Sequence, residues 1–465
     1  MIDKEHKKLL TDVNQKLLDY LEVIDLKSVS TADEIRADID LSLGPSSNFD
    51  IIRDSIDKYL FHSTKTASPS FFNQLYGGFS VTGHIGEILT SITNNSMYTY
   101  EMSPVATLIE TEVIEKMSSI VGYQKGGGIF VTGGSNGNFL AMLAARHKKL
   151  PDAMSKGIFG TSRLTAFVSK ESHYSIPKAA VQLGLGTESI VYVDVDDDGR
   201  MLPSDLERLI LKSIENNELP FFVGATAGTT VRGSFDPITS INKICKKYDL
   251  WLHVDASWGG SALLSSKHKY LLKGSELSDS LSWCAHKAMA QPLICTVALF
   301  SDPTILREIN SIDGTDYLFH GEQLEEKNIG EFSLQCGRRV DALKLWLTWK
   351  YLGDKGFERN INNLVNLISY AQKKVEKSDN LDLISPSNYL NLCFQVSPKG
   401  LDQNRVNNFT KQVRDSLLQK GKAMVNYAQI GDKTCIRLVL ANYSLTETEI
   451  DTFFDNVEDI ITGFQ

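Results

Sequence analysis

Apolar residues near the N-terminus follow the period of a helix. Residues 5–24 carry an apolar stripe along one side of the expected helix. The stripe is formed by Leu10, Val13, Leu17, Leu21 and Ile24. An amphipathic helix of this kind can pack on its own chain or on a second subunit. The pattern alone favours neither arrangement.

From about residue 125, short apolar runs alternate with helical patterns. The runs that predict strands span residues 128–132, 164–169, 189–196, 221–227, 250–256, 281–285 and 295–300. The helical patterns span residues 139–149, 174–184, 202–217 and 236–249. Ser204 is expected to cap the third of these helices. Strands that alternate with helices indicate an α/β fold with a mostly parallel, doubly wound sheet.

Beyond about residue 335 the pattern changes. Long helices are predicted over 341–353 and 357–378, and strand-like pieces follow at 381–385, 391–397 and 435–442. This change predicts a smaller α+β domain at the C-terminus. The expected division is an N-terminal helical segment over 1–65, a large domain over 66–345 and a small domain over 346–465.

Composition narrows the possible partners. The net charge of −9 argues against nucleic acid, for which a basic surface would be expected. No apolar run approaches the roughly 18 residues of a membrane span, and the N-terminus lacks the apolar core of a secretory signal. The six cysteines are scattered and the nine histidines lack metal-ligand spacing. We therefore expect a cytoplasmic protein with free thiols, no metal and a small-molecule ligand.

Two residues carry the strongest chemical signal. Lys287 follows the apolar run 281–285, and Asp255 lies at the end of the run 250–256. Pyridoxal 5′-phosphate (PLP) requires a lysine amine for a Schiff base and an acid that keeps its ring nitrogen protonated. A structural ion pair is the alternative reading of a buried aspartate. The two residues together predict a PLP site.

Other polar residues also lie where strands of such a sheet end. Ser135 and Asn136 lie in a glycine-rich turn before a helix, and helix N-termini bind anions such as phosphate. His173 follows a strand, where its flat ring could stack on a cofactor, and Thr226 ends a strand among small residues. A turn without ligand, a helix-capping histidine and a tight loop are the structural alternatives.

Two candidates lie outside these turns. Arg437 is inside the apolar run 435–442, and it could bind a substrate carboxylate or form a structural salt bridge. Tyr317 lies in the polar, glycine-containing segment 312–332. This segment could be a lid that brings a proton donor to the site, or an ordinary surface loop.

The chain resembles the group II PLP-dependent amino acid decarboxylases, in particular the glutamate, cysteine sulfinate and aspartate decarboxylases. The resemblance extends from residue 71 to residue 442. Its most specific segments are TYEMSP, SHYSIPKAA, ATAGTTVRGSFDPI, YDLWLHVDASWGG, DYLFHGE and LQCGRRVDALKLWLTWK. It implies fold type I of PLP-dependent enzymes, as in aspartate aminotransferase, and decarboxylation of an L-amino acid to its amine and CO2. It also implies a homodimer with shared active sites, with the N-terminal segment at the interface.

The resemblance also implies roles for single residues. Lys287 would hold PLP, Asp255 would pair with the pyridinium nitrogen and His173 would stack on the ring. The residues near the phosphate would be Ser135, Asn136 and His286. Thr226 is not part of this set; its place among small residues suggests a hydrogen bond to the cofactor or to the substrate carboxylate. Arg437 would bind the substrate α-carboxylate, and Tyr317 would protonate Cα, acting in the partner subunit's site.

The segment around Gln74 and Tyr76 resembles the part of the family's pocket that reads the substrate side chain. The aromatic residues Tyr76 and Tyr98 favour a short acidic substrate such as aspartate or cysteine sulfinate, with glutamate also possible. The alternatives are a 2,4-diaminobutyrate decarboxylase, an aldehyde-forming PLP enzyme, which Tyr317 disfavours, and a non-enzymatic homologue. The chain departs from the family at DASWGG, where DAAWGG is usual, and at WCAHK, where WNPHK is usual. Ser257 thus adds a hydroxyl group beside the expected cofactor ring.

Overall fold

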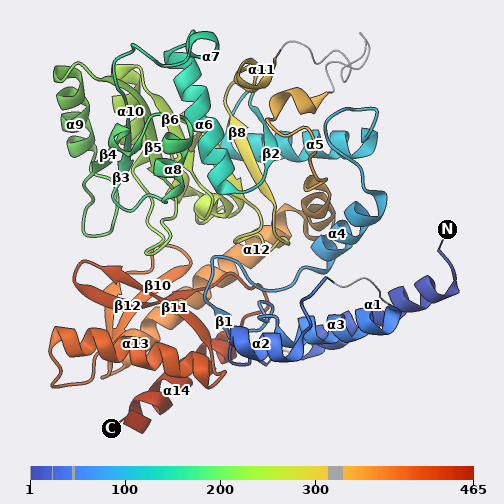
Figure 1. Cartoon of the computed structure of the whole chain (residues 1–465). Coiled ribbons are helices and arrows are strands. Elements are labelled where there is room, and N and C mark those ends of the chain that lie inside the picture. Colours follow the sequence, from blue (N-terminus) through green and yellow to red (C-terminus); the bar gives the residue numbers. More distant parts are fainter. Residues whose placement is uncertain (1, 24, 44–47, 313–327, 465) are drawn as a thin grey trace. The chain divides into compact units, whose positions relative to one another are not determined.

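The computed structural model describes residues 2–23, 25–43, 48–312 and 328–464. The chain divides into two compact units (Figure 1). The large unit contains residues 79–369 and 385–392, and the small unit contains residues 1–78, 370–384 and 393–465. The N-terminal segment therefore groups with the C-terminal part of the chain, a division different from the three consecutive regions expected from the sequence. Among the residues described, no helix has the length and apolar character needed to cross a membrane.

A seven-stranded sheet forms the centre of the large unit. Its strand order is β2-β8-β7-β6-β5-β3-β4, and the strands are β2 (Gly127–Val131), β3 (Leu164–Ser169), β4 (Ile190–Val193), β5 (Leu219–Thr226), β6 (Trp251–Asp255), β7 (Ser280–Cys284) and β8 (Thr296–Phe300). Strands β4, β3, β5, β6 and β7 are parallel, whereas β8 runs antiparallel to both β7 and β2. All seven predicted strands are present, and the mostly parallel sheet is confirmed.

Eight described helices lie entirely within the large unit, and several of them pack on the sheet. They are α4 (Val81–Thr93), α5 (Pro104–Val121), α6 (Gly134–Lys149), α7 (Ala153–Lys156), α8 (Ser175–Gln182), α9 (Pro203–Glu215), α10 (Ile238–Tyr248) and α11 (Thr304–Asn310). Short 3-10 turns occupy Thr187–Ser189, Gly259–Leu264, Lys269–Leu272, Ser275–Leu277 and Ile329–Phe332. Helices α6 and α8 pack on each other, while α9 and α10 pack together against β5 (Figure 1). Apolar side chains of α6, α8 and the strands, such as Leu140, Ile176 and Phe222, form the main core.

The expected cap of α9 is wrong. The helix begins at Pro203, Leu202 is the N-cap residue, and no side chain caps the helix. Proline suits the first helical position because its fixed φ matches the helix and its missing N–H would have no helical partner there. Ser204 is therefore already inside the helix.

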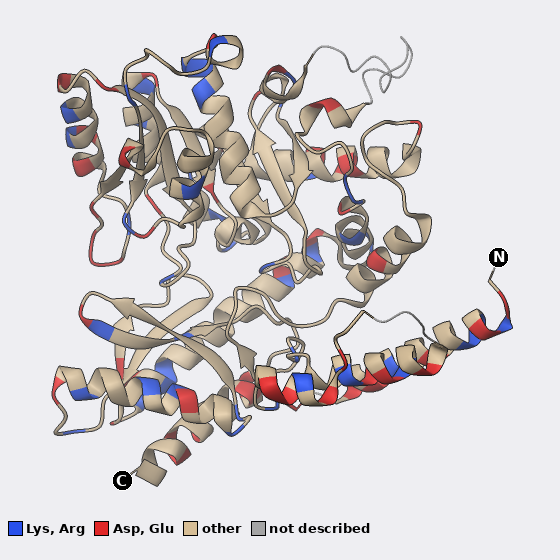
Figure 2. Ribbon diagram, viewed as in Figure 1, with Lys and Arg blue, Asp and Glu red and all other residues tan. Residues whose placement is uncertain are grey.

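The small unit combines helices with a five-stranded sheet of order β1-β11-β12-β10-β9. Its elements are α1 (Lys4–Glu22), α2 (Ala32–Asp38), α3 (Phe49–His62), β1 (Phe71–Phe72), β9 (Leu381–Ser385), β10 (Asn391–Val396), α13 (Gln403–Gln419), β11 (Met424–Ile430), β12 (Lys433–Val439) and α14 (Glu447–Phe464). Helices α1 and α3 pack together, and acidic and basic side chains are interspersed along both (Figure 2). The long helix α12 (Ala342–Lys377) begins in the large unit and ends in the small one, and it is kinked at Gly353.

Candidate active site

One cavity of the large unit lies where β5, β6 and β7 end and α6 begins. In open α/β sheets, ligands bind at the carboxyl ends of the strands. The cavity is lined by Gly134, Ser135, Asn138, His173, Thr226, Gly228, Thr230, Asp255, Ser257, Trp258, Cys284, His286 and Lys287. Six of these residues were predicted from the sequence: Ser135, His173, Thr226, Asp255, His286 and Lys287. The structure thus brings together residues that are up to 152 positions apart, from Ser135 to Lys287.

Asp255 is a buried carboxylate at the end of β6. Its Oδ2 accepts a hydrogen bond of 2.8 Å from Asn138 Nδ2, and its Oδ1 accepts one of 3.1 Å from the Ser257 backbone N–H. Burial alone would raise the pKa of Asp255, but the charge of Lys287 and hydrogen bonds from Ser257 and Asn138 lower it. The cavity therefore contains a permanent negative charge that can hold a cationic group.

Asn138 is one of the cavity residues that were not predicted from the sequence. It lies in the first turns of α6, buried, and besides Asp255 it donates to Ser175 Oγ at 2.9 Å. Its Oδ1 lies 2.9 Å from His253 Nε2. The segment 133–138 looks like one continuous turn in the sequence. The helix in fact begins at Gly134, so that Asn138 is a helical residue whose side chain reaches β6 and α8.

Each hydrogen bond around His253 has a defined donor and acceptor. Burial lowers the pKa of His253 to about 4, so the ring is neutral at pH 7. Trp251 donates its indole N–H to Ser280 Oγ at 2.8 Å, and Ser280 Oγ lies 2.9 Å from His253 Nδ1. The Asp255 carboxylate only accepts hydrogen bonds, so the NH2 group of Asn138 points toward Asp255 and its Oδ1 toward His253. His253 Nε2 therefore carries the ring proton and donates to Asn138 Oδ1, which leaves Nδ1 to accept from Ser280 Oγ.

His173 lies in the loop between β3 and α8 and lines the cavity. Its Nδ1 accepts the Ser175 backbone N–H at 3.2 Å and lies 2.8 Å from Ser175 Oγ. Burial lowers the pKa of His173, which favours the neutral ring. Because Nδ1 is an acceptor, the neutral ring carries its proton on Nε2. A neutral, flat imidazole of fixed orientation is suited to stacking on an aromatic cofactor.

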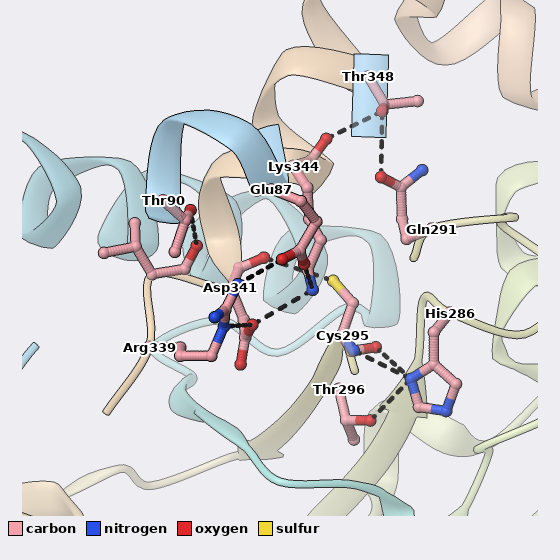
Figure 3. A network of polar contacts seen from close by, with 11 residues as sticks. Glu87, Thr90, His286, Gln291, Cys295, Thr296, Arg339, Asp341, Lys344 and Thr348 are labelled. Carbon is pink, nitrogen blue, oxygen red and sulfur yellow. Dashed lines mark hydrogen bonds and ion pairs between the residues drawn. The ribbon is translucent and has the colours of Figure 1, made fainter. Parts of the chain in front are cut away.

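His286 and Lys287 lie in the loop after β7, and α12 and α4 support this loop (Figure 3). His286 Nδ1 lies 3.0 Å from the backbone N of Cys295 and 3.3 Å from Thr296 Oγ1. Cys295 Sγ contacts the backbone oxygen of Asp341, whose carboxylate lies 3.2 Å from Lys344 Nζ. Lys344, almost fully buried, also pairs with Glu87 of α4.

The cavity has features that fit a phosphorylated, polar ligand. No side chain caps the N-terminus of α6, which leaves backbone N–H groups for an anion. Among the residues described, Thr226 Oγ1, Ser257 Oγ and Asn136 Oδ1 are buried without a hydrogen-bond partner. Buried polar atoms normally have partners. Asn136 does not line the cavity itself, and it follows Ser135, which does.

The remaining predicted residues lie elsewhere in the chain. Arg437 of β12 is in the small unit and donates from Nη2 to the backbone oxygen of Asn73 at 2.7 Å. This bond places Arg437 beside the segment that contains Gln74, which is exposed, and Tyr76, which is half-buried. Tyr317 lies outside the described residues.

Comparisons with known proteins agree with these features. The sequence profile of the pyridoxal-dependent decarboxylase conserved domain matches residues 34–397. Cysteine sulfinic acid decarboxylase of Mus musculus is 37% identical over 459 residues, which cover 96% of this chain and 92% of the mouse protein. Acidic amino acid decarboxylase GADL1 of Homo sapiens is 37% identical over 459 residues, which cover 96% of this chain and 87% of the human protein. The crystal structure of mouse CSAD superimposes with a TM-score of 0.94 at 36% identity, covering 97% of this chain and 98% of that chain.

Proposed function

Because the chain belongs to the pyridoxal-dependent decarboxylase family, we propose that it removes the α-carboxyl group of a short acidic L-amino acid as CO2 and releases the amine. PLP is the cofactor, and the fold is type I of PLP-dependent enzymes. The observation that carries the proposal is the meeting of Lys287, Asp255 and His173 around one cavity. When bound there, PLP supplies an aldehyde that condenses with an amine and a protonated ring that accepts the electrons of the broken Cα–carboxylate bond.

The proposed roles follow from the geometry of each side chain. Lys287 carries the amine that holds the cofactor. The buried carboxylate of Asp255 keeps a proton on the ring nitrogen, which maintains the ring as an electron acceptor. His173 packs its flat, neutral ring on the cofactor, and the hydroxyl of Thr226, which has no partner in the described structure, donates to the cofactor or substrate. Ser135, Asn136 and His286 surround the phosphate at the start of α6.

The substrate proposal rests on residues of the small unit and on the relatives. Arg437 binds the α-carboxylate through its bidentate guanidinium, and Gln74 and Tyr76 contact the side chain of the substrate. The curated relatives are named for cysteine sulfinic acid and for acidic amino acids, which supports a short acidic substrate over the basic 2,4-diaminobutyrate. Tyr317 protonates Cα, which favours amine formation over the aldehyde-forming reaction.

We further propose a homodimer with shared active sites, located in the cytoplasm. Helices α4 and α5 of the large unit each expose apolar side chains, namely Val81, Ile85, Ile88, Leu89 and Ile92 on α4 and Val105 and Leu108 on α5. Ile92 is 75% exposed and Val105 is 69% exposed, and exposed apolar side chains that recur at helical spacing favour an interaction surface. A second copy of the chain can cover these apolar side chains. The N-terminal segment 1–65 would also lie at the interface between the two copies. The six cysteines are all free, as expected in a reducing compartment.

The test is a substrate panel with the PLP-loaded protein: aspartate, cysteine sulfinate, glutamate, 2,4-diaminobutyrate and aromatic amino acids. Amine and CO2 are measured together, and aldehyde, ammonia and peroxide are assayed in parallel. We expect turnover of aspartate or cysteine sulfinate. Turnover of 2,4-diaminobutyrate alone, or aldehyde in place of amine, would overturn the proposed reaction.

A variant pair tests the cofactor site separately. Lys287→Ala should lose the absorbance band of lysine-bound PLP and all turnover, because no other lysine lines the cavity in the described structure. Lys170→Ala is the matched control, since Lys170 is exposed, pairs with Asp194 and, like Asp194, does not line the cavity. Survival of a lysine-linked band in Lys287→Ala would contradict the assignment.

A further inference from the structure

A thiol and a hydroxyl group converge on the start of α6. Cys284 ends β7 and Ser257 follows β6, and both line the cavity. A Cβ built on Gly134, the first residue of α6, would lie 3.2 Å from Cys284 Sγ and 3.3 Å from Ser257 Cβ, and it would clash with Ser257 Oγ. The thiol and the hydroxyl group therefore lie against the turn at which the anion-binding N–H groups begin.

Both groups belong to the cavity wall, and their polar contacts differ. Ser257 is more than nine-tenths buried, and its Oγ has no hydrogen-bond partner within the described part of the chain. Cys284 Sγ accepts a hydrogen bond of 3.3 Å from Thr296 Oγ1. Burial favours the neutral thiol, but the charge of Lys287 and the contacts with His286 outweigh this effect and lower the pKa of Cys284 to about 7. A substantial fraction of the thiol is thus ionised at neutral pH.

We propose that Cys284 is an oxidation site covered by bound PLP, so that the cofactor protects the thiol and an oxidised thiol excludes the cofactor. This inference rests on the proposed function, because it takes the cavity to be the PLP site. The first oxidation places one oxygen atom on the sulfur beside Gly134, and a further oxidation would add another. An anionic sulfur oxyacid can accept the N–H groups of α6 that would otherwise bind phosphate. Oxidation and cofactor binding then compete for the same donors.

The oxidant required is a hydroperoxide. The Cys284 thiolate attacks one peroxide oxygen, an S–O bond forms and the O–O bond breaks. The leaving hydroxide takes a proton and departs as water when the peroxide is hydrogen peroxide. Sulfur is oxidised by two electrons and the peroxide is reduced by two. A thiol reductant reverses this first step, so loss of cofactor binding is reversible until a second oxidation occurs.

The chain contains its own controls. Cys336 is exposed and should be oxidised whether or not PLP is bound. Cys245 of α10 is 2% exposed, as is Cys284, but it does not line the cavity and burial raises its pKa, so it should stay reduced in both states. A protein that unfolds during treatment would expose Cys245, and this cysteine therefore reports on the fold.

The experiment compares the PLP-loaded protein with the same protein stripped of PLP by hydroxylamine and dialysis. Both are treated with hydrogen peroxide, quenched with catalase and unfolded. Peptide masses then give the oxidised fraction of each cysteine. We expect Cys284 to be oxidised in the stripped protein and protected in the loaded one. Equal oxidation of Cys284 in both states, or in neither, would overturn the proposal.

Cofactor uptake provides a second readout without turnover. The oxidised, stripped protein should fail to recover the PLP absorbance band, and a thiol reductant should restore it. The stripped protein of the Cys284→Ser variant should take up as much PLP after peroxide as before it. Loss of uptake in Cys284→Ser would place the damage elsewhere. Failure of untreated wild-type protein to form the band would instead contradict the proposed function, so the two failures are distinguishable.

Discussion

At the residue scale, Asn138 determines how the buried carboxylate of Asp255 is presented. It connects Asp255 and Ser175 to His253, and the Asp255 carboxylate, which can only accept, fixes the orientation of the amide. Removing the amide leaves several buried polar groups without partners. Each such group costs about 1 to 3 kcal/mol of stability.

We therefore expect Asn138→Ala to lower both the unfolding temperature and the affinity for PLP. The affinity falls because Asp255 loses the group that holds its carboxylate in place. Asn310→Ala is the matched control, since Asn310 donates to the backbone oxygens of Leu306 and Phe332. The control should lose stability but keep its PLP affinity, as measured by absorbance titration. Equal losses of affinity in both variants would show that Asn138 acts only through global stability.

The ionisation of Cys284 makes its reactivity depend on pH. Its pKa is lowered from an ordinary value near 9 to about 7, and the thiolate is the reactive form. In the stripped protein, the rate of Cys284 oxidation should therefore rise as the pH increases and reach half its maximum near pH 7. Lys287→Ala removes the charge that opposes burial, so the midpoint should move to higher pH. In Lys170→Ala the midpoint should stay where it is in the wild type.

The sequence could predict that Lys287, Asp255, His173 and Thr226 lie near one another because each lies at or shortly after the end of an apolar run. Asn138 was not predicted because a glycine-rich turn and the first turn of a helix have the same composition. The hydrogen-bond partners of Asn138 lie in β6 and α8, and nothing local in the sequence connects them.

At the element scale, a close approach of two helices supports the loop that carries His286 and Lys287. A Cβ on Gly86 of α4 would lie 2.5 Å from Lys344 Cα of α12, far inside normal contact distance. Glycine is therefore required at this position. The close packing allows Lys344 to pair with Glu87 while contacting Asp341 (Figure 3).

Gly86→Ala should lower the free energy of unfolding. Overpacking typically costs about 1 to 3 kcal/mol, which exceeds the gain of about 1 kcal/mol in helix propensity. Gly463→Ala in α14 is the control, because a Cβ there meets nothing within 4 Å. The control should unfold at the same denaturant concentration as the wild type or at a slightly higher one. A stability of Gly86→Ala equal to that of the control would show that α4 and α12 can move apart freely.

The strands of the large unit could be predicted because fully buried parallel strands are short, continuous apolar runs. The start of α9 could not be predicted in the same way. Serine often caps helices, which favours Ser204, but Pro203 before it already takes the first helical position. Strand β1 is only two residues long and pairs with β11, more than 350 positions away. A strand this short has no periodic pattern from which it could be predicted.

At the scale of the whole molecule, the chain does not form consecutive domains. Residues 1–78 group with residues 393–465, and the link is made by β1, which pairs in parallel with β11. Hydrophobic patterns along the sequence show where one kind of structure gives way to another. They do not show which distant segments pack together. The Arg437 guanidinium and the Asn73 backbone oxygen likewise meet across 364 positions.

The proposed sharing of active sites makes a quantitative prediction for mixed dimers. Lys287→Ala and Tyr317→Phe should each lose most amine formation as homodimers. Co-expression of the two variants gives mixed dimers, in which one site combines an intact Lys287 with an intact Tyr317 from the partner. Random pairing makes about one quarter of all sites complete in this way. If Tyr317 served the site of its own subunit, no complete site would form. Recovery of about a quarter of wild-type amine production would therefore support a shared site, whereas recovery no greater than in the separate variants would contradict it.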